Sequence, residues 1–301
     1  MKILFLGSPE FAKVVLQSVI KSSHKVVGVV TQPDRPSGRG HKIVSPEAKI
    51  FAEQNGIPVY QFEKIRQNMD TIREIDYDIA LVASFGQILS EEFLNHRLTI
   101  NVHPSILPKY RGSTPIQSAI LNGDNETGVT IMKLVKEVDA GDVLLQQKVK
   151  IEPCEVYSSL ANRLGLLGGE MAVKALDLIE SGQAKFKPQD HSKATFVKLI
   201  KKEDGHIDFL ATADEIVNKF RALGEKPGVY MTIGDDNIKI GGIAKAGGTG
   251  IPGQVLCAKK RLIVACKDGA VEITSLQAPS GKMLRTVDFL NGYKLEGKEI
   301  K

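Results

Sequence analysis

The sequence predicts an α/β domain followed by a small all-β domain, and three observations support this. Over residues 1–184, short apolar runs alternate with amphipathic stretches of helical spacing. The apolar runs lack a polar face, which is typical of strands in a parallel sheet that helices cover. After residue 206, short β-branched runs follow one another closely between Gly and Asp clusters, as in small sandwiches and barrels.

The first domain shows the rhythm of a β-α-β fold. Apolar runs predict strands at 2–7, 26–31, 57–60, 78–84 and 98–103. Helical spacing predicts a helix that begins at Pro9 with Ser8 as its cap, because proline suits the first helical position. Two more helices are expected at 46–55 and 63–75.

Two further strands and a long helix complete this domain, which we expect to span residues 1–184. The runs at 128–135 and 143–151 are separated by only a short connection. Such a connection predicts antiparallel strands at one edge of the sheet. Residues 155–180 carry apolar side chains at helical spacing and predict a long helix.

The second domain is expected at residues 207–301, after a linker at 185–206. The linker is polar and rich in lysine, as is typical of a segment on the surface. Thr212 or Asp214 can cap a helix that runs to Leu223. Strands are expected at 229–233, 237–243, 253–256, 262–266 and 270–276.

Composition and charge exclude several classes of protein. The chain has 301 residues, 42% of them hydrophobic and 25% charged, which excludes a disordered tail and a disulfide miniprotein. Residues 1–184 contain 20 basic and 21 acidic side chains, and residues 185–301 contain 20 and 14. The basic excess in the last third indicates either an anionic partner or solvated surface lysines.

Several features predict a cytoplasmic protein without a membrane span. No apolar run approaches the ~20 residues that cross a bilayer. The N-terminal apolar stretch is shorter than that of a signal peptide. The three cysteines lack metal-ligand spacing, so we expect buried free thiols in a reducing compartment and no bound metal. Nothing demands a dimer, and we expect a monomer.

Glycine-rich nucleotide motifs are missing. The turn after the first strand is Gly7-Ser8-Pro9, which does not match the dinucleotide-binding G-x-G-x-x-G. The pair Gly38 and Gly40 lacks the frame of a phosphate-binding loop. We therefore expect no bound nucleotide cofactor.

Asn101 and His103 form a candidate site at the end of the strand 98–103. Residues two apart on a strand share a face, and ligands of open α/β sheets bind beyond the strands' carboxyl ends. An amide and an imidazole suit a carbonyl oxygen that becomes anionic. An acid from the turn 139–142, placed against His103, would hold the ring charged and oriented. The open alternatives are a histidine satisfied locally and acids that serve only their turn.

The stretch NVHPSILPKYRGSTPIQSAILNGDNETGVT from Asn101 to Thr130, together with the later VDAGD, resembles the folate-dependent formyltransferases. The early loop TQPDRPSGRGHK and the C-terminal part are similar to the branch that acts on methionyl-tRNA. The resemblance covers nearly the whole chain. It implies a doubly wound, mostly parallel sheet domain followed by a barrel of the oligonucleotide-binding type.

The resemblance also implies the reaction and its residues. A formyl group would pass from 10-formyltetrahydrofolate, the co-substrate, to the free amine of initiator methionyl-tRNA. Asn101, His103 and Asp139 are the implied catalytic residues. The folate would contact Ser105, Ile106, Leu107 and Pro108. Two further segments would line its pocket through backbone groups. They are the turn 139–142 and the segment Phe85, Gly86, Gln87, Ile88 and Leu89.

The basic loop 31–45 is the segment that the resemblance assigns to the tRNA acceptor end. It carries Arg35, Arg39 and Lys42, and such cations suit phosphate. Pro33, Pro36, Gly38 and Gly40 are expected to prevent regular structure in this loop. An ordinary basic surface loop is the alternative.

Three other functions share parts of this pattern. A formyltransferase for a small amine, such as a glycinamide ribonucleotide or an amino sugar nucleotide, would use the same catalytic trio. A hydrolase that releases formate from the folate would use water in place of the amine. A non-catalytic RNA-binding protein would not need Asn101, His103 and Asp139 to converge.

Overall fold

The computed structural model describes residues 1–37, 42–295 and 300. The chain divides into two compact units. The first unit comprises Met1–Pro115, Glu126–Lys150 and Ser159–Lys198, and the second comprises Ile116–Asn125, Ile151–Ser158 and Leu199–Lys301. Each unit has its own main sheet.

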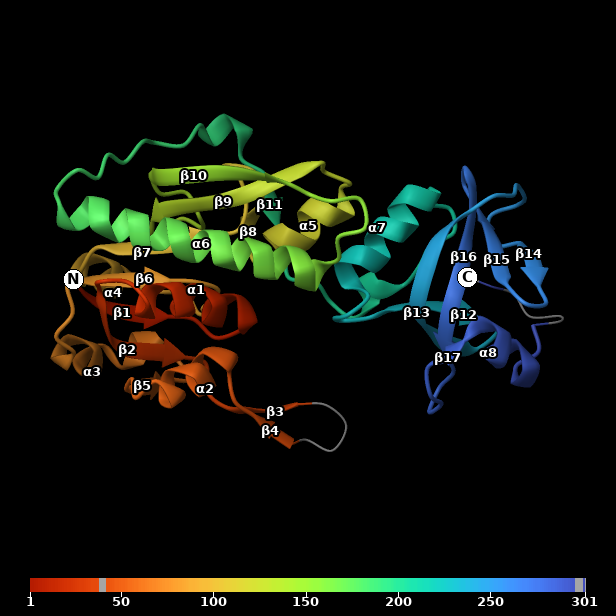
Figure 1. Cartoon of the computed structure of the whole chain (residues 1–301), viewed down its shortest axis with the longest axis horizontal. Coiled ribbons are helices and arrows are strands. Elements are labelled where there is room, and N and C mark those ends of the chain that lie inside the picture. The colour runs from red at the N-terminus through yellow and green to blue at the C-terminus, as the bar shows by residue number, and fades with distance from the viewer. Residues whose placement is uncertain (38–41, 296–299, 301) are drawn as a thin grey trace. The chain divides into compact units, whose positions relative to one another are not determined.

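The first unit contains a seven-stranded sheet in the order β10-β9-β7-β6-β1-β2-β5 (Figure 1). Its strands are β1 (Lys2–Leu6), β2 (Lys25–Thr31), β5 (Val59–Gln61), β6 (Ile79–Val82), β7 (Thr99–His103), β9 (Glu126–Lys133) and β10 (Val143–Lys150). The five strands from β7 to β5 are parallel, while β9 and β10 are antiparallel and end the sheet at one edge. A parallel-dominant α/β sheet with an antiparallel edge is confirmed.

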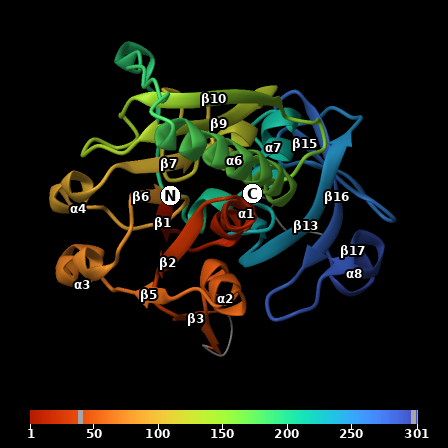
Figure 2. The same cartoon turned by 60° about the vertical axis from the view of Figure 1, so that its left-hand side comes forward.

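Helices cover both faces of this sheet (Figure 2). They are α1 (Glu10–Ile20), α2 (Glu47–Gln54), the short η1 (Ile65–Gln67), α3 (Met69–Glu74), α4 (Glu91–His96) and α6 (Tyr157–Glu180). Leu4 and Leu6 of β1 belong to one core cluster with Ile72 of α3 and Phe93 of α4. On the other face α6 lies close to β7, because a Cβ at Gly168 would come within 2.6 Å of the Val102 side chain. Both faces are therefore buried, which explains the continuous apolar runs.

The structure corrects several expected boundaries in this unit. Helix α1 begins at Glu10 with Pro9 at the N-cap, and no side chain caps it. The expected Ser8 cap is wrong, because the Ser8 hydroxyl instead accepts a hydrogen bond from the Gln32 backbone, at 2.9 Å. The helix expected at 63–75 is divided into η1 and α3.

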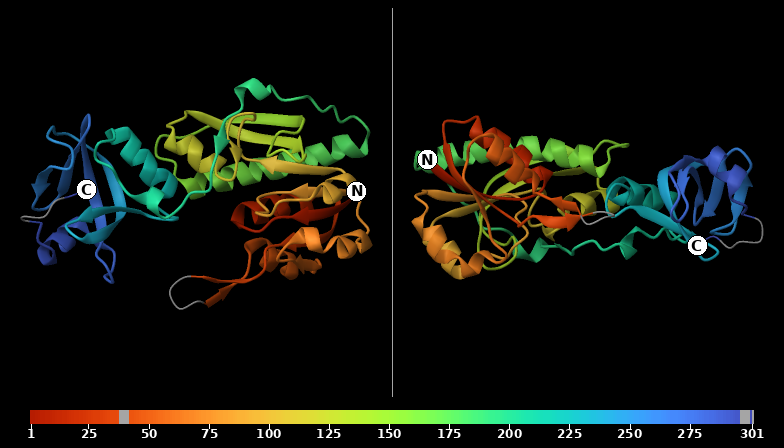
Figure 3. Two further views of the ribbon diagram at one scale, coloured as in Figure 1. Left: turned by 180° about the vertical axis from the view of Figure 1, so that it is seen from behind. Right: turned by 90° about the horizontal axis from the view of Figure 1, so that it is seen from below.

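The loop 31–45 contains a short antiparallel ribbon, which contradicts the expectation of no regular structure. Strands β3 (Arg35–Ser37) and β4 (Lys42–Val44) pair with Pro36 opposite Ile43. Figure 3 shows the ribbon extending from the end of β2. A two-stranded ribbon leaves one edge of each strand free, so a proline whose nitrogen faces that edge removes no ladder hydrogen bond.

The second unit contains an antiparallel sheet in the order β12-β13-β16-β15-β14, with β17 also paired to β16. Its elements are α5 (Pro115–Leu121), η3 (Glu203–Gly205), α7 (Ala213–Leu223), β12 (Val229–Ile233), β13 (Asp236–Ala246), β14 (Val255–Ala258), β15 (Leu262–Cys266), β16 (Gly269–Gln277), β17 (Leu284–Arg285) and α8 (Thr286–Gly292). Within the described strands, the two ends of this order do not pair with each other. A separate antiparallel β unit is thus confirmed, but a closed barrel is not.

Thr212, and not Asp214, caps helix α7. The Thr212 hydroxyl accepts a hydrogen bond from the Glu215 backbone, and the Glu215 carboxylate accepts one from the Thr212 backbone. This capping box satisfies two N–H groups of the helix start, and it holds the pKa of Glu215 below its usual range.

We expect Thr212→Ala to lower the free energy of unfolding by about 1 kcal/mol, because an orphan N–H loses its partner. Asp214→Ala is the matched control. Within the described ranges its carboxylate pairs with the exposed Lys245 alone, and exposed pairs contribute little. Denaturant unfolding of both variants checks this, and equal losses would contradict the assignment of the cap.

The segment 187–198 belongs to the first unit and pairs with distant parts of it. Strand β11 (Phe196–Val197) pairs in parallel with β8 (Arg111–Gly112), and η2 (His191–Lys193) precedes it. Gln189 is buried, at 7% exposed, which a surface linker does not predict. The pairing partners lie about 80 positions away in the chain, beyond the range of any local pattern.

The expectation of buried thiols holds only in part. Cys266 is buried, but Cys154 is exposed, and all three thiols are free. Within residues 1–37, 42–295 and 300, no helix has the length and apolar character that crossing a bilayer requires.

Candidate functional site

The candidate site lies where the strand order of the first sheet reverses. From β1 the chain continues to β2 and β5 on one side, and then returns to β6 and β7 on the other. Crevices at such a switch point, beyond the carboxyl ends of the strands, are where open α/β sheets bind ligands. A ligand is therefore expected at the carboxyl ends of β1, β6 and β7.

Asn101 and His103 lie on the same side of β7 at this edge. Asn101 pairs with Val82 of β6 on one side and Met132 of β9 on the other. The two side chains are 8% and 4% exposed. Among the described residues, no hydrogen bond involves the Asn101 amide, so its donors remain available to a ligand.

Asp139 lies between β9 and β10, and the structure brings it to His103. Its Oδ2 atom is 3.6 Å from His103 Nδ1 and accepts a hydrogen bond of 2.8 Å from the Gly112 backbone. Gly112 has φ +117, and a Cβ there would lie 2.2 Å from the Val197 carbonyl oxygen. Only glycine therefore fits the position that presents this N–H to the carboxylate.

The two nitrogens of His103 have different partners. Nε2 is 2.9 Å from the Tyr110 carbonyl oxygen, and Nδ1 faces Asp139. The Tyr110 carbonyl only accepts hydrogen bonds, so Nε2 carries a proton and donates it to this oxygen. Nε2 is therefore occupied by a hydrogen bond, whereas Nδ1 lies beyond hydrogen-bond distance of the Asp139 carboxylate.

Unusual backbone conformations gather at this edge. Of the non-glycine residues that the structure describes, four have positive φ, and three of these are Ser84 at φ 48, Tyr110 at φ 62 and Asp139 at φ 48. Ser84 follows β6, Tyr110 supplies the carbonyl to His103, and Asp139 supplies the carboxylate. Such conformations persist only where surrounding contacts enforce them, and they are typical of functional sites.

The loop after His103 is held by inward hydrogen bonds. The Ser105 side chain is fully buried and donates to the Lys109 carbonyl at 2.6 Å. The Thr130 hydroxyl donates to the Ser105 carbonyl at 2.7 Å and accepts from the Leu107 backbone at 3.2 Å. Leu107 is 4% exposed, whereas Ile106 and Pro108 are half-buried. Ser105 and Leu107 therefore shape the loop from within.

The segment Phe85–Leu89 presents its backbone at the switch point. Phe85 is in the core, and the Gln87 amide donates to the Phe62 carbonyl at 2.7 Å. Gly86 has φ +79, and Ile88 is 90% exposed. The inward side chains anchor this segment, while Gly86 and Ile88 remain accessible.

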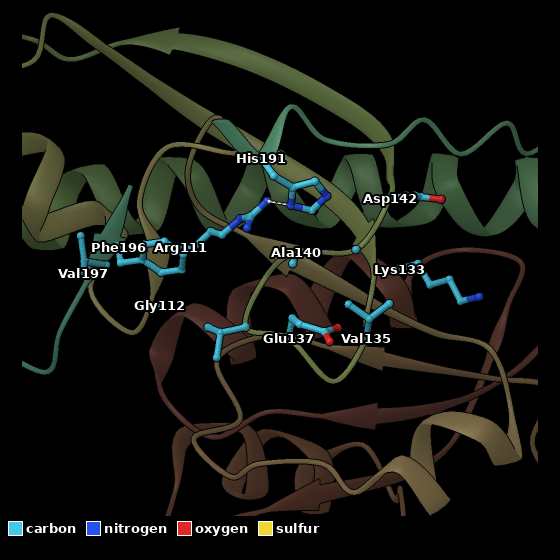
Figure 4. Close-up of a pocket in the computed structure, with 12 residues that line it drawn as sticks. Arg111, Gly112, Lys133, Val135, Glu137, Ala140, Asp142, His191, Phe196 and Val197 are labelled. Atoms are coloured by element: carbon cyan, nitrogen blue, oxygen red, sulfur yellow. Dashed lines mark hydrogen bonds between the residues drawn. The ribbon is translucent and has the colours of Figure 1, made fainter. Parts of the chain in front are cut away.

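An open pocket of about 850 Å³ adjoins the turn that carries Asp139 (Figure 4). Its walls are formed by the turn 137–142, by β8 and β11 and by His191. Phe196 and Val138 are 69% and 60% exposed and make its rim apolar. Asn101 and His103 do not line it.

Arg111 and Gln189, which border this turn, are residues that the sequence analysis missed. The Gln189 amide donates to the carbonyls of Asp139 and Gly141, and it accepts from the Arg111 guanidinium. Gln189 stands in a Lys-rich stretch without periodicity, so no local signal marks it.

The basic loop is only partly described. Arg35 is half-exposed and forms an ion pair with Glu63. Arg39 lies outside the described residues, and Lys42 is placed only as the first residue of β4. A role of these three cations in tRNA binding therefore stays a prediction.

One group of potential metal ligands exists among the described residues, formed by His24, just before β2, and by the C-terminal end of α6. Ligand atoms of His24, Asp177 and Glu180 lie within 4.8 Å of one another. The Met1 ammonium donates to Glu180 at 2.8 Å and lies 3.2 Å from His24 Nδ1. A cation already occupies this place, and the expectation of no bound metal stays a prediction.

The chain matches two family patterns. The family described as formyl transferase matches residues 1–176, and the one described as formyl transferase, C-terminal domain, matches residues 199–294. A methionyl-tRNA formyltransferase from Sulfurihydrogenibium sp. (strain YO3AOP1) is 43% identical over 308 residues, which cover 99% of this chain and 99% of that protein.

Solved structures share the fold at low identity. HypX from Aquifex aeolicus in complex with tetrahydrofolic acid has a TM-score of 0.68 and 19% identity, covering 99% of this chain and 48% of HypX. This chain therefore spans about half the length of HypX. An N-formyltransferase from Helicobacter canadensis, in complex with folinic acid and dTDP-3-aminofucose, has a TM-score of 0.70 and 20% identity, covering 91% and 98%.

Proposed function

Because this chain belongs to the formyl transferase family, we propose that it transfers the formyl group of 10-formyltetrahydrofolate to the amine of initiator methionyl-tRNA. The resemblance stated from the sequence is confirmed at the level of the family. The mechanism rests on the Asn101 amide, which has no hydrogen-bond partner in the described part of the chain. It lies on the same side of β7 as His103, which faces Asp139. This arrangement supplies donors and a carboxylate at one edge.

Asn101 and His103 act on the formyl oxygen. When the amine of methionyl-tRNA adds to the formyl carbon, this oxygen becomes negative. The Asn101 amide and the His103 Nδ1–H donate hydrogen bonds to it, and pre-positioned donors of this kind are among the largest contributors to catalysis. Tyr110 holds the ring by accepting from Nε2.

Asp139 orients His103 and handles the amine proton. Addition of the amine forms a C–N bond and leaves an extra proton on its nitrogen, which Asp139 accepts through water. Collapse then breaks the bond from the formyl carbon to N10 of the folate, and this nitrogen takes up the proton. The formyl group is thereby moved without oxidation or reduction.

The folate is expected beside the segments 85–89 and 105–108 and the turn 139–142. Gly86 and Ile88 are accessible at the switch point, and Ile106 and Pro108 border the same edge. The turn 139–142 offers backbone groups. A planar heterocycle with several donors and acceptors suits such a surface, because backbone N–H and C=O groups fix its orientation.

The acceptor end of the tRNA is expected at the loop with Arg35, Arg39 and Lys42, and the second unit is expected to bind the rest. Contacts with phosphate supply most of such affinity. A barrel of the oligonucleotide-binding type, domain limits at 184 and 207, a monomeric state and a cytoplasmic location remain predictions that follow from the same proposal.

A formylation assay tests this function. We expect formyl-folate and charged initiator tRNA to give formylmethionyl-tRNA, with far less product from charged elongator tRNA. The KM for tRNA should rise steeply with salt, since phosphate contacts release counterions.

Amino sugar nucleotides and glycinamide ribonucleotide serve as competing acceptors in parallel reactions. Preferred formylation of a small amine, or release of formate without an acceptor, would assign the site to one of the alternative functions. A KM that ignores ionic strength would contradict the phosphate contacts.

A further inference from the structure

The turn that carries Asp139 is held from behind by one buried side chain. The Gln189 Nε2 atom donates to the Asp139 carbonyl at 2.8 Å and to the Gly141 carbonyl at 2.7 Å. Gln189 is 7% exposed. Both hydrogens of its amide are therefore committed to the backbone of this turn.

Arg111 determines which way the Gln189 amide faces. The guanidinium only donates hydrogen bonds, and its Nε and Nη2 atoms lie 3.2 and 2.7 Å from Gln189 Oε1. The amide oxygen must face Arg111, and the NH₂ group must therefore face the turn. His191 Nδ1, 3.1 Å away, accepts a further bond from the guanidinium (Figure 4).

Arg111 is itself buried, at 4% exposed. In the part of the chain that the structure describes, no carboxylate pairs with it. Neutral acceptors alone thus hold a buried cation. A hydrophobic or fully paired arrangement would stabilise the fold more, so the present one is not explained by stability.

The turn needs such support. Asp139 has φ 48, a left-handed conformation that residues with a Cβ adopt only where surrounding contacts support it. A relaxed turn would move Oδ2 away from His103 and from the Gly112 N–H.

We propose that Gln189, with its amide oriented by Arg111, is a positioning residue that holds the left-handed turn so that Asp139 reaches His103. The inference rests on the proposed function, because it takes Asp139 as the catalytic carboxylate. Gln189 itself contacts no reacting atom and acts only through the turn.

Gln189→Glu separates positioning from folding. One carboxylate oxygen can still accept from Arg111, and the new charge pairs with the buried guanidinium, so the melting temperature should stay the same or rise. The other oxygen faces two carbonyl oxygens and repels them. We expect kcat to fall by about 10- to 100-fold, since small misplacements at a site have effects of this size, while the KM for tRNA stays within about twofold.

Two further measurements make the test specific. In an Asp139→Asn background, Gln189→Glu should lower kcat little further, because residues that act through one another are not additive. Backbone hydrogen exchange at residues 137–142 should become faster in Gln189→Glu, and this readout does not depend on activity. Gln183→Glu, the same change at an exposed glutamine, is the matched control and should leave kcat unchanged.

Three results for Gln189→Glu would each overturn the positioning role. They are a wild-type kcat, unchanged backbone hydrogen exchange at residues 137–142, and a loss of kcat that is explained by a lower melting temperature. Failure of the wild-type chain to formylate methionyl-tRNA would overturn the proposed function instead. In that case the exchange data alone still decide whether Gln189 holds the turn.

Discussion

Asn101→Ala is expected to lower kcat for formyl transfer by about 10²–10³-fold, the usual effect of removing one donor to an oxyanion. The fold should be unaffected, because the amide makes no hydrogen bond within the described residues and its loss leaves no protein group unpaired. Single-turnover formylation with saturating tRNA and folate measures the effect directly. Thermal unfolding of the same sample confirms that the variant is native.

Asn101→Asp tests the hydrogen-bond donor separately from the size of the side chain. It keeps the size of the side chain but replaces the donor with a charged acceptor, so the loss should exceed that of the alanine. Turnover close to wild type in either variant would exclude Asn101 from the reaction. Equal losses in both would point to a role in shape only.

His103 permits a test of which ring nitrogen reaches the substrate. The amide nitrogen of asparagine lies near the place of Nδ1, and that of glutamine lies near the place of Nε2. We expect His103→Gln to keep the bond to the Tyr110 carbonyl and to be the more stable variant, yet to lose formyl transfer by about 10²–10³-fold. His103→Asn should be less stable but retain more activity.

The informative result is that stability and activity rank the His103→Gln and His103→Asn variants in opposite orders. If the more stable variant is also the more active, Nε2 and not Nδ1 serves the reaction, and the assignment made from the 3.6 Å approach to Asp139 is wrong. His103→Ala, measured beside them, gives the activity that remains without any donor at this position.

Features of the fold that depend on short-range patterns were predictable. Strands at 229–233 and 262–266 match the observed bounds of β12 and β15, because β-branched runs between turn residues carry a strong local signal. The placement of Asn101 and His103 on one side of a strand follows from the period of two alone. The helix α7 was expected, and only the choice between two caps was open.

Short and isolated elements were harder to predict. Helices α4 and α5 have six and seven residues, which is too few for helical periodicity to stand out. The ribbon β3-β4 lies in a loop rich in Pro and Gly, where composition indicates no structure. The number of short strands predicts a β unit in the last third, but not whether they close into a barrel.

The amino-acid sequence, read without coordinates, was enough to determine a parallel-dominant α/β unit, a separate β unit, the family and the neighbouring pair Asn101 and His103. Tertiary structure decided how Asp139 is brought to His103 and what holds it there. Gln189 contacts Asp139 from 50 positions away and Arg111 from 78. The reason is physical: periodicity encodes neighbours within a turn or a strand, whereas contacts between distant segments exist only after the chain has packed.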